Sequence, residues 1–388
     1  MLLLLRGGSV FAPEPLGICD LLVGGGKILA IAPKLPPMEA FAPAPVTEIS
    51  LQGARVIPGL LDAHVHSTGG GGEAGPHTRV PAVPLSAFTL GGITTVVGLL
   101  GTDGTTRSME NLVAATNALR VEGLSAYCWT GGYEVPPVTL SGSVRRDIAF
   151  VEPIIGVGEM AISDHRSSQP TFEEFIRIAA DCHVGGLMTG KAGILHLHLG
   201  DGKRGLSLVR RALDETELPP RVFYPTHVNR NKALFDEALA IAPRGATVDV
   251  TAFPVEEGED AWSAEDAIER YWAAGGPDSR ITCSSDGGGC LPTFNGQGEL
   301  VRMDFARPSA LAGALRALLD RGHPLERVLP VFTSNVANLL RLHQKGRIAV
   351  GTDADLVVLS DEHHVRDVLA GGRVVVRHGV PTVRGTFE

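Results

Sequence analysis

The sequence predicts an α/β protein with a (β/α)8 TIM barrel at its centre and a small β-sandwich domain formed by the N- and C-terminal segments. Three observations lead to this prediction. Strand-like and helix-like stretches alternate through the central part of the chain, both ends contain only strand-like runs, and polar side chains gather where the predicted strands end. An open doubly wound sheet is the structural alternative.

Both ends of the chain have the pattern of strands joined by tight turns. Short apolar runs at 2–5, 18–23 and 27–31 are separated by Gly and Pro, and runs at 355–359 and 373–376 repeat this pattern. We therefore expect residues 1–55 and 346–388 to form the small β domain, and residues 56–345 to form the barrel.

Eight apolar runs in the central segment have the length and composition of buried strands. They lie at residues 56–66, 93–100, 125–130, 154–162, 194–199, 222–228, 246–252 and 281–285, and helix-like stretches between them include 109–122, 171–183, 233–242 and 265–274. Their number and alternation match the barrel, whose usual length is about 250 residues.

The composition limits the classes of partner. Hydrophobic residues make up 44% and charged residues 20% of the chain, as in globular proteins, and the net charge of -9 argues against a nucleic-acid partner. The five cysteines are dispersed, so we expect reduced thiols in a cytoplasmic protein. The apolar start is too short for a signal peptide and no run is long enough to cross a bilayer, so we expect no membrane partner.

Histidines close three of the predicted strands. His64 and His66 lie on one face of the first strand because side chains alternate with period two, and two imidazoles on one face can bind a cation such as zinc. His198 ends the fifth strand and His227 ends the sixth, although His196 points the same way as His198 and competes with it. The alternative for each histidine is an ordinary hydrogen-bonded position.

Other polar residues at the strand ends suit hydrolytic chemistry. Asp286 follows the eighth strand and suits a metal ligand that shuttles protons, although a turn aspartate is the alternative. Glu73 lies in a glycine-rich loop that could fold over a substrate or be a mobile surface loop. Arg166 and Arg230 could grip carboxylates or form surface salt bridges, and Tyr133 could donate to an oxyanion or be an exposed loop residue.

At these residues the sequence resembles the isoaspartyl dipeptidases of the amidohydrolase superfamily. The His-x-His pair at 64–66 is a mark of the superfamily. More specific stretches are the glycine-Glu loop at 69–76 and the segments 96–103, 162–166, 225–231 and 284–287. The resemblance runs through the barrel and into the C-terminal segment.

The resemblance implies two zinc ions per chain, for which other divalent metals can substitute. It implies that His64 and His66 bind one ion, His198 and His227 bind the other, and Asp286 binds the first and acts as general acid and base. Tyr133 would polarise the scissile carbonyl. The substrate-binding set would be Glu73 and Thr102 for the amine, Arg166 and Arg230 for the carboxylate, and Gly71 and Cys290 beside them.

The chain departs from this family at two positions. The family bridges its metals with a carboxylated lysine on the fourth strand, but this strand carries Glu159 there and has no lysine. Glu159 is shorter, so we expect Gly156 and Gly158 to permit a bulge that brings it closer to the metals. Cys290 stands where the family has a substrate-contacting serine.

The expected function is hydrolysis of the isopeptide bond of β-aspartyl dipeptides by a metal-bridging hydroxide. The alternatives are a cyclic-amide hydrolase, an N-acyl-amino-acid deacylase, or a catalytically silent barrel that binds peptides. We expect a small dipeptide as the substrate and a homo-oligomer as the assembly.

Overall fold

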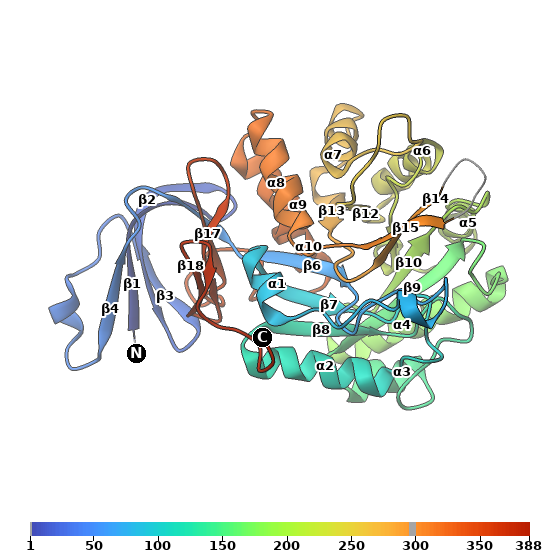
Figure 1. Cartoon of the computed structure of the whole chain (residues 1–388), viewed down its shortest axis with the longest axis horizontal. Coiled ribbons are helices and arrows are strands. Elements are labelled where there is room, and N and C mark those ends of the chain that lie inside the picture. The colour runs from blue at the N-terminus through green and yellow to red at the C-terminus, as the bar shows by residue number, and fades with distance from the viewer. Residues whose placement is uncertain (1, 295–299) are drawn as a thin grey trace.

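The computed structural model describes residues 2–294 and 300–388, and it has a strand-rich part at one end beside a larger α/β barrel (Figure 1). The predicted fold class is confirmed. Among the described helices, none is both long and apolar enough to cross a membrane.

The two chain ends share one nine-stranded sheet, in the order β19-β18-β17-β16-β5-β1-β2-β3 with β4 paired to β1. β16 pairs antiparallel with β5, so the sheet joins segments from both ends of the chain. Its strands are β1 (Leu2–Phe11), β2 (Pro15–Gly24), β3 (Lys27–Ala32), β4 (Val46–Ser50), β5 (Arg55–Pro58), β16 (Leu356–Leu359), β17 (Val365–Ala370), β18 (Arg373–Arg377) and β19 (Val380–Pro381).

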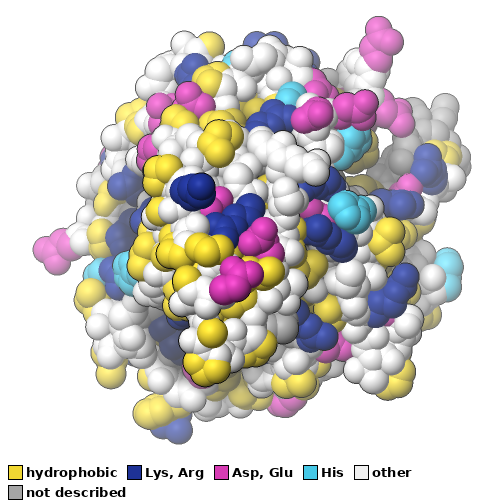
Figure 2. Space-filling view, turned by 90° about the vertical axis from the view of Figure 1, so that its left-hand side faces the viewer, with side chains coloured by type: hydrophobic (Ala, Val, Ile, Leu, Met, Phe, Trp, Pro, Cys, Tyr) yellow, Lys and Arg dark blue, Asp and Glu magenta, His cyan; other side chains and the backbone are white. Residues whose placement is uncertain are grey.

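A separate hydrophobic cluster holds this sheet together. Leu5 and Leu21 from the N-terminal strands pack in it with Leu356 and Val358 from β16. Figure 2 shows the face at this end of the molecule, where hydrophobic, basic and acidic side chains are mixed. The division of the chain at residues 55/56 and 345/346 stays a prediction.

Eight parallel strands form the barrel. β6 to β11 make a six-stranded sheet, and β12 and β13 pair with each other. Between the ends of β11 and β12, Val228 N donates to Asp249 O (3.3 Å), and between the ends of β6 and β13, His66 N donates to Gly287 O (2.8 Å). These two hydrogen bonds close the barrel. The strands are β6 (Leu60–Val65), β7 (Ile93–Gly98), β8 (Ser125–Thr130), β9 (Ile154–Ser163), β10 (Ile194–Leu199), β11 (Phe223–Thr226), β12 (Val248–Thr251) and β13 (Ile281–Ser284).

The first predicted strand is in fact two strands. The apolar run 56–66 divides at Gly59, so that β5 joins the terminal sheet and β6 joins the barrel. A Cβ atom at Gly59 would lie 2.1 Å from Oγ1 of Thr94, so a side chain there would collide with β7. An apolar run alone cannot reveal this division, because both strands are buried.

Helices follow most barrel strands. The helix predicted at 171–183 extends to Thr189 and ends at Gly190, which has a φ of 74°. The helices are α1 (Leu85–Leu90), α2 (Met109–Glu122), α3 (Val144–Phe150), α4 (Phe172–Thr189), α5 (Ser207–Glu215), α6 (Lys232–Ile241), α7 (Ala264–Ala273), α8 (Ala310–Asp320), α9 (Leu325–Phe332) and α10 (Ser334–Leu339).

Short elements complete the fold. A hairpin of β14 (Cys290–Phe294) and β15 (Leu300–Phe305) follows the eighth barrel strand and was not predicted from the sequence. Short 3-10 helices lie at η1 (Met38–Phe41), η2 (Pro76–Thr78), η3 (Pro220–Val222), η4 (Ala242–Arg244) and η5 (Asp278–Arg280).

Candidate active site

The carboxyl ends of five barrel strands bring the six predicted metal ligands together. The strands are β6, β9, β10, β11 and β13, whose ends face one rim of a parallel barrel. All six side chains are buried there: His64, His66, Glu159, His198, His227 and Asp286.

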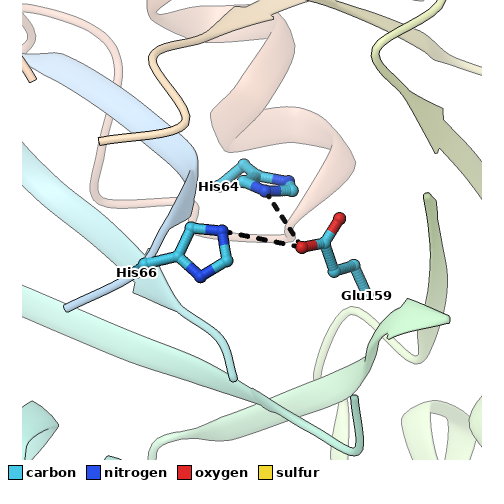
Figure 3. Close-up of side chains that lie close together, drawn as sticks. All are labelled: His64, His66 and Glu159. Carbon is cyan, nitrogen blue, oxygen red and sulfur yellow. Dashed lines mark ion pairs between the residues drawn. The ribbon is translucent and has the colours of Figure 1, made fainter. Parts of the chain in front are cut away.

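Glu159 lies between two pairs of histidines. Its Oε1 is 3.5 Å from Nε2 of His64 and 3.6 Å from Nε2 of His66, and Figure 3 shows both contacts converging on that oxygen. Its Oε2 is 2.8 Å from Nδ1 of His198 and 3.5 Å from Nε2 of His227. Each oxygen of one carboxylate therefore faces a different histidine pair.

Asp286 completes the group on the His64 side. Its Oδ1 lies 3.3 Å from Nε2 of His64 and 3.1 Å from Nε2 of His66. The buried Nε2 of His64 and Oδ1 of Asp286 have no hydrogen-bond partner among the described residues. Buried polar atoms normally have a partner, so this set of imidazoles and carboxylates fits divalent cations. Three overlapping groups of three residues within the set have ligand atoms close enough together to hold a metal ion.

His196 lies behind His64 and not among the candidate ligands. Its Nδ1 is 3.0 Å from the backbone O of Tyr224, and its Nε2 is 2.8 Å from Nδ1 of His64. Because a carbonyl oxygen can only accept, Nδ1 of His196 donates to it and Nε2 accepts from His64. In neutral His64, the form that binds a metal, the lone pair is therefore on Nε2, which faces Glu159 and Asp286.

The other two histidines are oriented by residues that the sequence analysis did not single out. Nε2 of His198 donates to Oδ2 of Asp164 (2.9 Å), so Nδ1, which lies 2.8 Å from Oε2 of Glu159, is the nitrogen available to a metal. Nδ1 of His227 lies 2.7 Å from Oγ1 of Thr251. Thr251 ends the seventh strand, which had no predicted role. Asp164 lay inside the segment 162–166 that carried the resemblance, so that segment was the available signal.

A break in strand register brings Glu159 to the centre of the group. Between β9 and β10 the pairing passes from Val157 opposite Leu195 to Met160 opposite Leu197, so Gly158 and Glu159 together face one residue. A Cβ at Gly158 would lie 2.7 Å from the Cβ of His196, and one at Gly156 would lie 2.4 Å from Ile194 O. The glycines allow this close approach, as the sequence predicted.

Burial and neighbouring charges set the protonation of the group. Burial raises the pKa of Glu159, but in the metal-free protein the positive charges of protonated His64 and His198 outweigh this effect and hold the pKa well below its usual range. Burial, aided by the charge of Arg230, lowers the pKa of His227 to about 3, so this imidazole stays neutral and able to bind a metal.

Two predicted substrate-side residues contact the ring of His198. The hydroxyl of Tyr133 is 2.8 Å from Nδ1 of His198, and Nη1 of Arg230 is 3.4 Å from Nε2 of the same ring. Burial and the charge of Glu159 raise the pKa of Tyr133 well above its usual value, so its hydroxyl keeps its proton. Tyr133 is buried and is not an exposed loop residue.

Three further predicted residues form a chain of hydrogen bonds across the rim. Oε1 of Glu73 accepts from Oγ1 of Thr102 (2.6 Å) and from Nη1 of Arg166 (3.3 Å). Arg166 is also held in two places by Asp164, through Nε to Oδ1 (2.9 Å) and Nη2 to Oδ2 (2.7 Å). An acidic and a guanidinium group therefore lie together beside His198.

The glycine-rich loop is fixed by a buried arginine that was not predicted to have a role. Arg107 donates to the carbonyl oxygens of Gly70 (2.7 Å) and Gly71 (3.1 Å). A Cβ at Gly71, whose φ is 72°, would lie 3.4 Å from the Cβ of Cys290, so these two predicted residues are adjacent. Burial raises the pKa of Cys290 to about 11, so its thiol is protonated at neutral pH.

Comparisons with known proteins agree with this geometry. A model of the "Amidohydrolase family" matches residues 55–375. The solved structure of a beta-aspartyl dipeptidase from Fervidobacterium islandicum AW-1, in complex with beta-Asp-Leu dipeptide, is 42% identical, covers 98% of each chain and has a TM-score of 0.92.

A second structure of the beta-aspartyl dipeptidase from this organism is 40% identical over 98% of this chain and 99% of that one, with a TM-score of 0.89. The allantoinase of Streptomyces avermitilis is 26% identical, and the match covers 93% of this chain and 86% of the allantoinase. The resemblance expected from the sequence is confirmed.

Proposed function

Since the chain belongs to the amidohydrolase family and is a metal-dependent hydrolase, we propose a substrate for it. It cleaves the isopeptide bond of β-aspartyl dipeptides at a two-metal site. The observation that carries the substrate assignment is the contact between Glu73 and Arg166 beside His198. The 42% identity to a beta-aspartyl dipeptidase over 98% of both chains supports it.

We assign one metal ion to His64, His66 and Asp286, and the other to His198 and His227, with Glu159 as the bridge. The two oxygens of Glu159, each facing one histidine pair, support this assignment. Imidazole nitrogens and carboxylate oxygens suit zinc, and other divalent metals tolerate the same ligands. When bound, the two cations lower the pKa of a water and supply a nucleophile at neutral pH.

Two side chains would act on the reacting atoms. Asp286 would accept the proton of the attacking water and return it to the leaving amine, since its Oδ1 lies within 3.3 Å of both His64 and His66. Burial raises the pKa of Asp286, but its close contacts with His64 and His66 and their positive charges outweigh burial and hold the pKa well below its usual range, so the carboxylate is ionised before it accepts a proton. Tyr133 would donate its hydroxyl proton in a hydrogen bond to the scissile carbonyl oxygen.

The remaining rim residues would hold the charged end of the substrate. A β-aspartyl dipeptide carries its α-amine and α-carboxylate together on the residue before the scissile bond. Glu73 and Thr102 would accept the amine, while Arg166 and Arg230 would bind the carboxylate. An α-aspartyl peptide places these charges differently and would leave charged groups of the site without a partner on the substrate.

The test is a comparison of steady-state rates for β-Asp-Leu and α-Asp-Leu, with a hydantoin and an N-acetyl amino acid as further substrates. We expect kcat/KM for the β isomer to exceed that for the α isomer by about 10⁴, the discrimination typical of sites that pair each polar group. Equal rates for the isomers, or activity only on the hydantoin or the acylated amino acid, would reject the proposal. Homo-oligomerisation and a cytoplasmic location stay predictions.

A further inference from the structure

We propose that Asp164 is a positioning residue that couples the substrate-binding Arg166 to the metal ligand His198. One carboxylate would then align both the guanidinium that holds the substrate and the imidazole that holds one metal ion. This inference rests on the proposed function, because it assumes the roles assigned there to Arg166 and His198.

Asp164 has the contacts that such a role requires. Its side chain is 1% exposed, and both of its oxygens are used. Oδ2 accepts from Nε2 of His198 (2.9 Å) and from Nη2 of Arg166 (2.7 Å). Oδ1 accepts from Nε and from the backbone N of Arg166, at 2.9 and 2.7 Å. The carboxylate is therefore held from two sides, by His198 and by Arg166.

The contact with His198 selects the tautomer that can bind a metal. Both carboxylates beside His198 can only accept, Asp164 at Nε2 (2.9 Å) and Glu159 at Nδ1 (2.8 Å). When a metal ion takes the place of the hydrogen on Nδ1, Asp164 would keep the remaining hydrogen on Nε2 and leave the lone pair of Nδ1 to the metal. Arg230 makes this selection necessary, because its Nη1 lies 3.4 Å from the same Nε2. A guanidinium only donates, so without Asp164 it would favour a lone pair on Nε2 and a hydrogen on the metal-facing Nδ1.

The contact with Arg166 fixes the plane of the guanidinium. Asp164 occupies Nε and Nη2 in a fork-to-fork pair, which leaves Nη1 pointing to Glu73 at 3.3 Å. The same plane lies over the ring of Tyr133, with Cζ 5.4 Å from the ring centroid. Loss of Asp164 would therefore free Arg166 to rotate away from the substrate end.

The test measures zinc retention directly, without reference to activity. Wild type and Asp164→Asn, both loaded with zinc, are titrated with a chelator and their bound zinc is measured by elemental analysis. We expect one of the two zinc equivalents in Asp164→Asn to bind about 10- to 100-fold more weakly, and the other to be unchanged. The KM for β-Asp-Leu should rise as well. Retention of both equivalents at the wild-type chelator midpoint would overturn the proposal.

Asp201→Asn is the matched control. Asp201 pairs with the exposed His165 at 2.7 Å, and its side chain is 63% exposed. Asp201→Asn removes the same charge within 4.8 Å of Asp164 without removing a hydrogen bond to His198 or Arg166. We expect its zinc midpoints and its KM to equal those of wild type, and a shift as large as that of Asp164→Asn would show that charge alone is responsible and overturn the proposal.

Gly200→Ala provides a second variant that keeps the carboxylate but displaces it. A Cβ atom at Gly200 would lie 1.9 Å from Oδ2 of Asp164, so this oxygen must leave the position in which it accepts from His198. We expect the same selective weakening of one zinc equivalent. This variant decides the question if Asp164→Asn does not fold, and normal zinc retention in it would contradict the proposal.

The two hypotheses can fail separately. If wild type does not hydrolyse β-aspartyl dipeptides, the proposed function fails, while the zinc titrations still decide whether Asp164 orients His198. If wild type is active and Asp164→Asn retains both zinc equivalents, only the role of Asp164 is rejected.

Discussion

Nε2 of His196 lies 2.8 Å from Nδ1 of His64, and the two rings meet edge to face with their centroids 5.0 Å apart. His196 is itself held by the backbone O of Tyr224. A histidine deeper in the barrel thereby determines which nitrogen of His64 faces Glu159 and Asp286.

Replacing His196 should loosen His64. His196→Leu leaves Nδ1–H of His64 buried without an acceptor, at a cost of about 1–3 kcal/mol in the free energy of unfolding of the metal-free protein. Metal affinity should fall about 10- to 100-fold. Urea unfolding and chelator competition measure the two effects. Unchanged metal affinity would mean that the tautomer of His64 does not depend on this contact.

The protein should contain two metal ions per chain after purification in zinc. His64→Ala and His227→Ala each remove a ligand from a different histidine pair, so each should reduce the content towards one ion. Elemental analysis gives the stoichiometry. A wild-type content near zero after metal-supplemented purification would contradict the metal assignment.

Assembly of the metal site should not require carbon dioxide. Glu159 already carries a carboxylate, whereas a bridging lysine must first react with carbon dioxide. Apoprotein reconstituted with zinc should therefore regain the same activity with and without bicarbonate. A strong bicarbonate requirement would indicate that a lysine forms the bridge.

Glu159→Gln should weaken the binding of both metal ions. A neutral amide cannot balance two cations as a carboxylate does, and its nitrogen cannot ligate one of them. Zinc titration of the apoprotein should give lower affinity for both equivalents. Loss of only one equivalent would argue against a bridging role.

Glu73→Gln should separate substrate binding from metal binding. Glu73 contacts Thr102 and Arg166 and no candidate metal ligand, so we expect zinc content to stay at the wild-type level. The kcat/KM for β-Asp-Leu should fall by about 10–100-fold, because a charge-assisted hydrogen bond contributes about 1.5–3 kcal/mol. Wild-type kcat/KM in this variant would exclude Glu73 from recognition of the amine.

The junction between barrel and terminal sheet should depend on Lys345. Its ammonium group is buried and lies 2.6 Å from Oδ2 of Asp355 and 2.7 Å from Oδ2 of Asp353. Lys345→Met leaves the buried Asp355 without its cation and should lower the free energy of unfolding by about 3–5 kcal/mol. Lys27→Met is the control: Lys27 is 41% exposed and also pairs with Asp353, so it should cost at most about 1 kcal/mol. Equal urea midpoints for the two variants would contradict this prediction.

Features that depend on local geometry could be predicted from the sequence. The alternation of apolar runs predicted the barrel strands, because strand and helix periods are properties of neighbouring residues. Period two placed His64 and His66 on one face, and the glycines at 156 and 158 indicated the bulge before Glu159.

Features that depend on depth and register could not be predicted, because they arise from contacts between distant segments. His196 and His198 lie on the same face of β10, and only the packing of β9, β10 and β11 places the first behind His64 and the second beside Glu159. The division of the run 56–66 at Gly59 and the position of Asp164 between His198 and Arg166 likewise depend on contacts with distant segments. Residue spacing fixes the direction of a side chain, whereas the partner that it meets is set by how separate strands pack together.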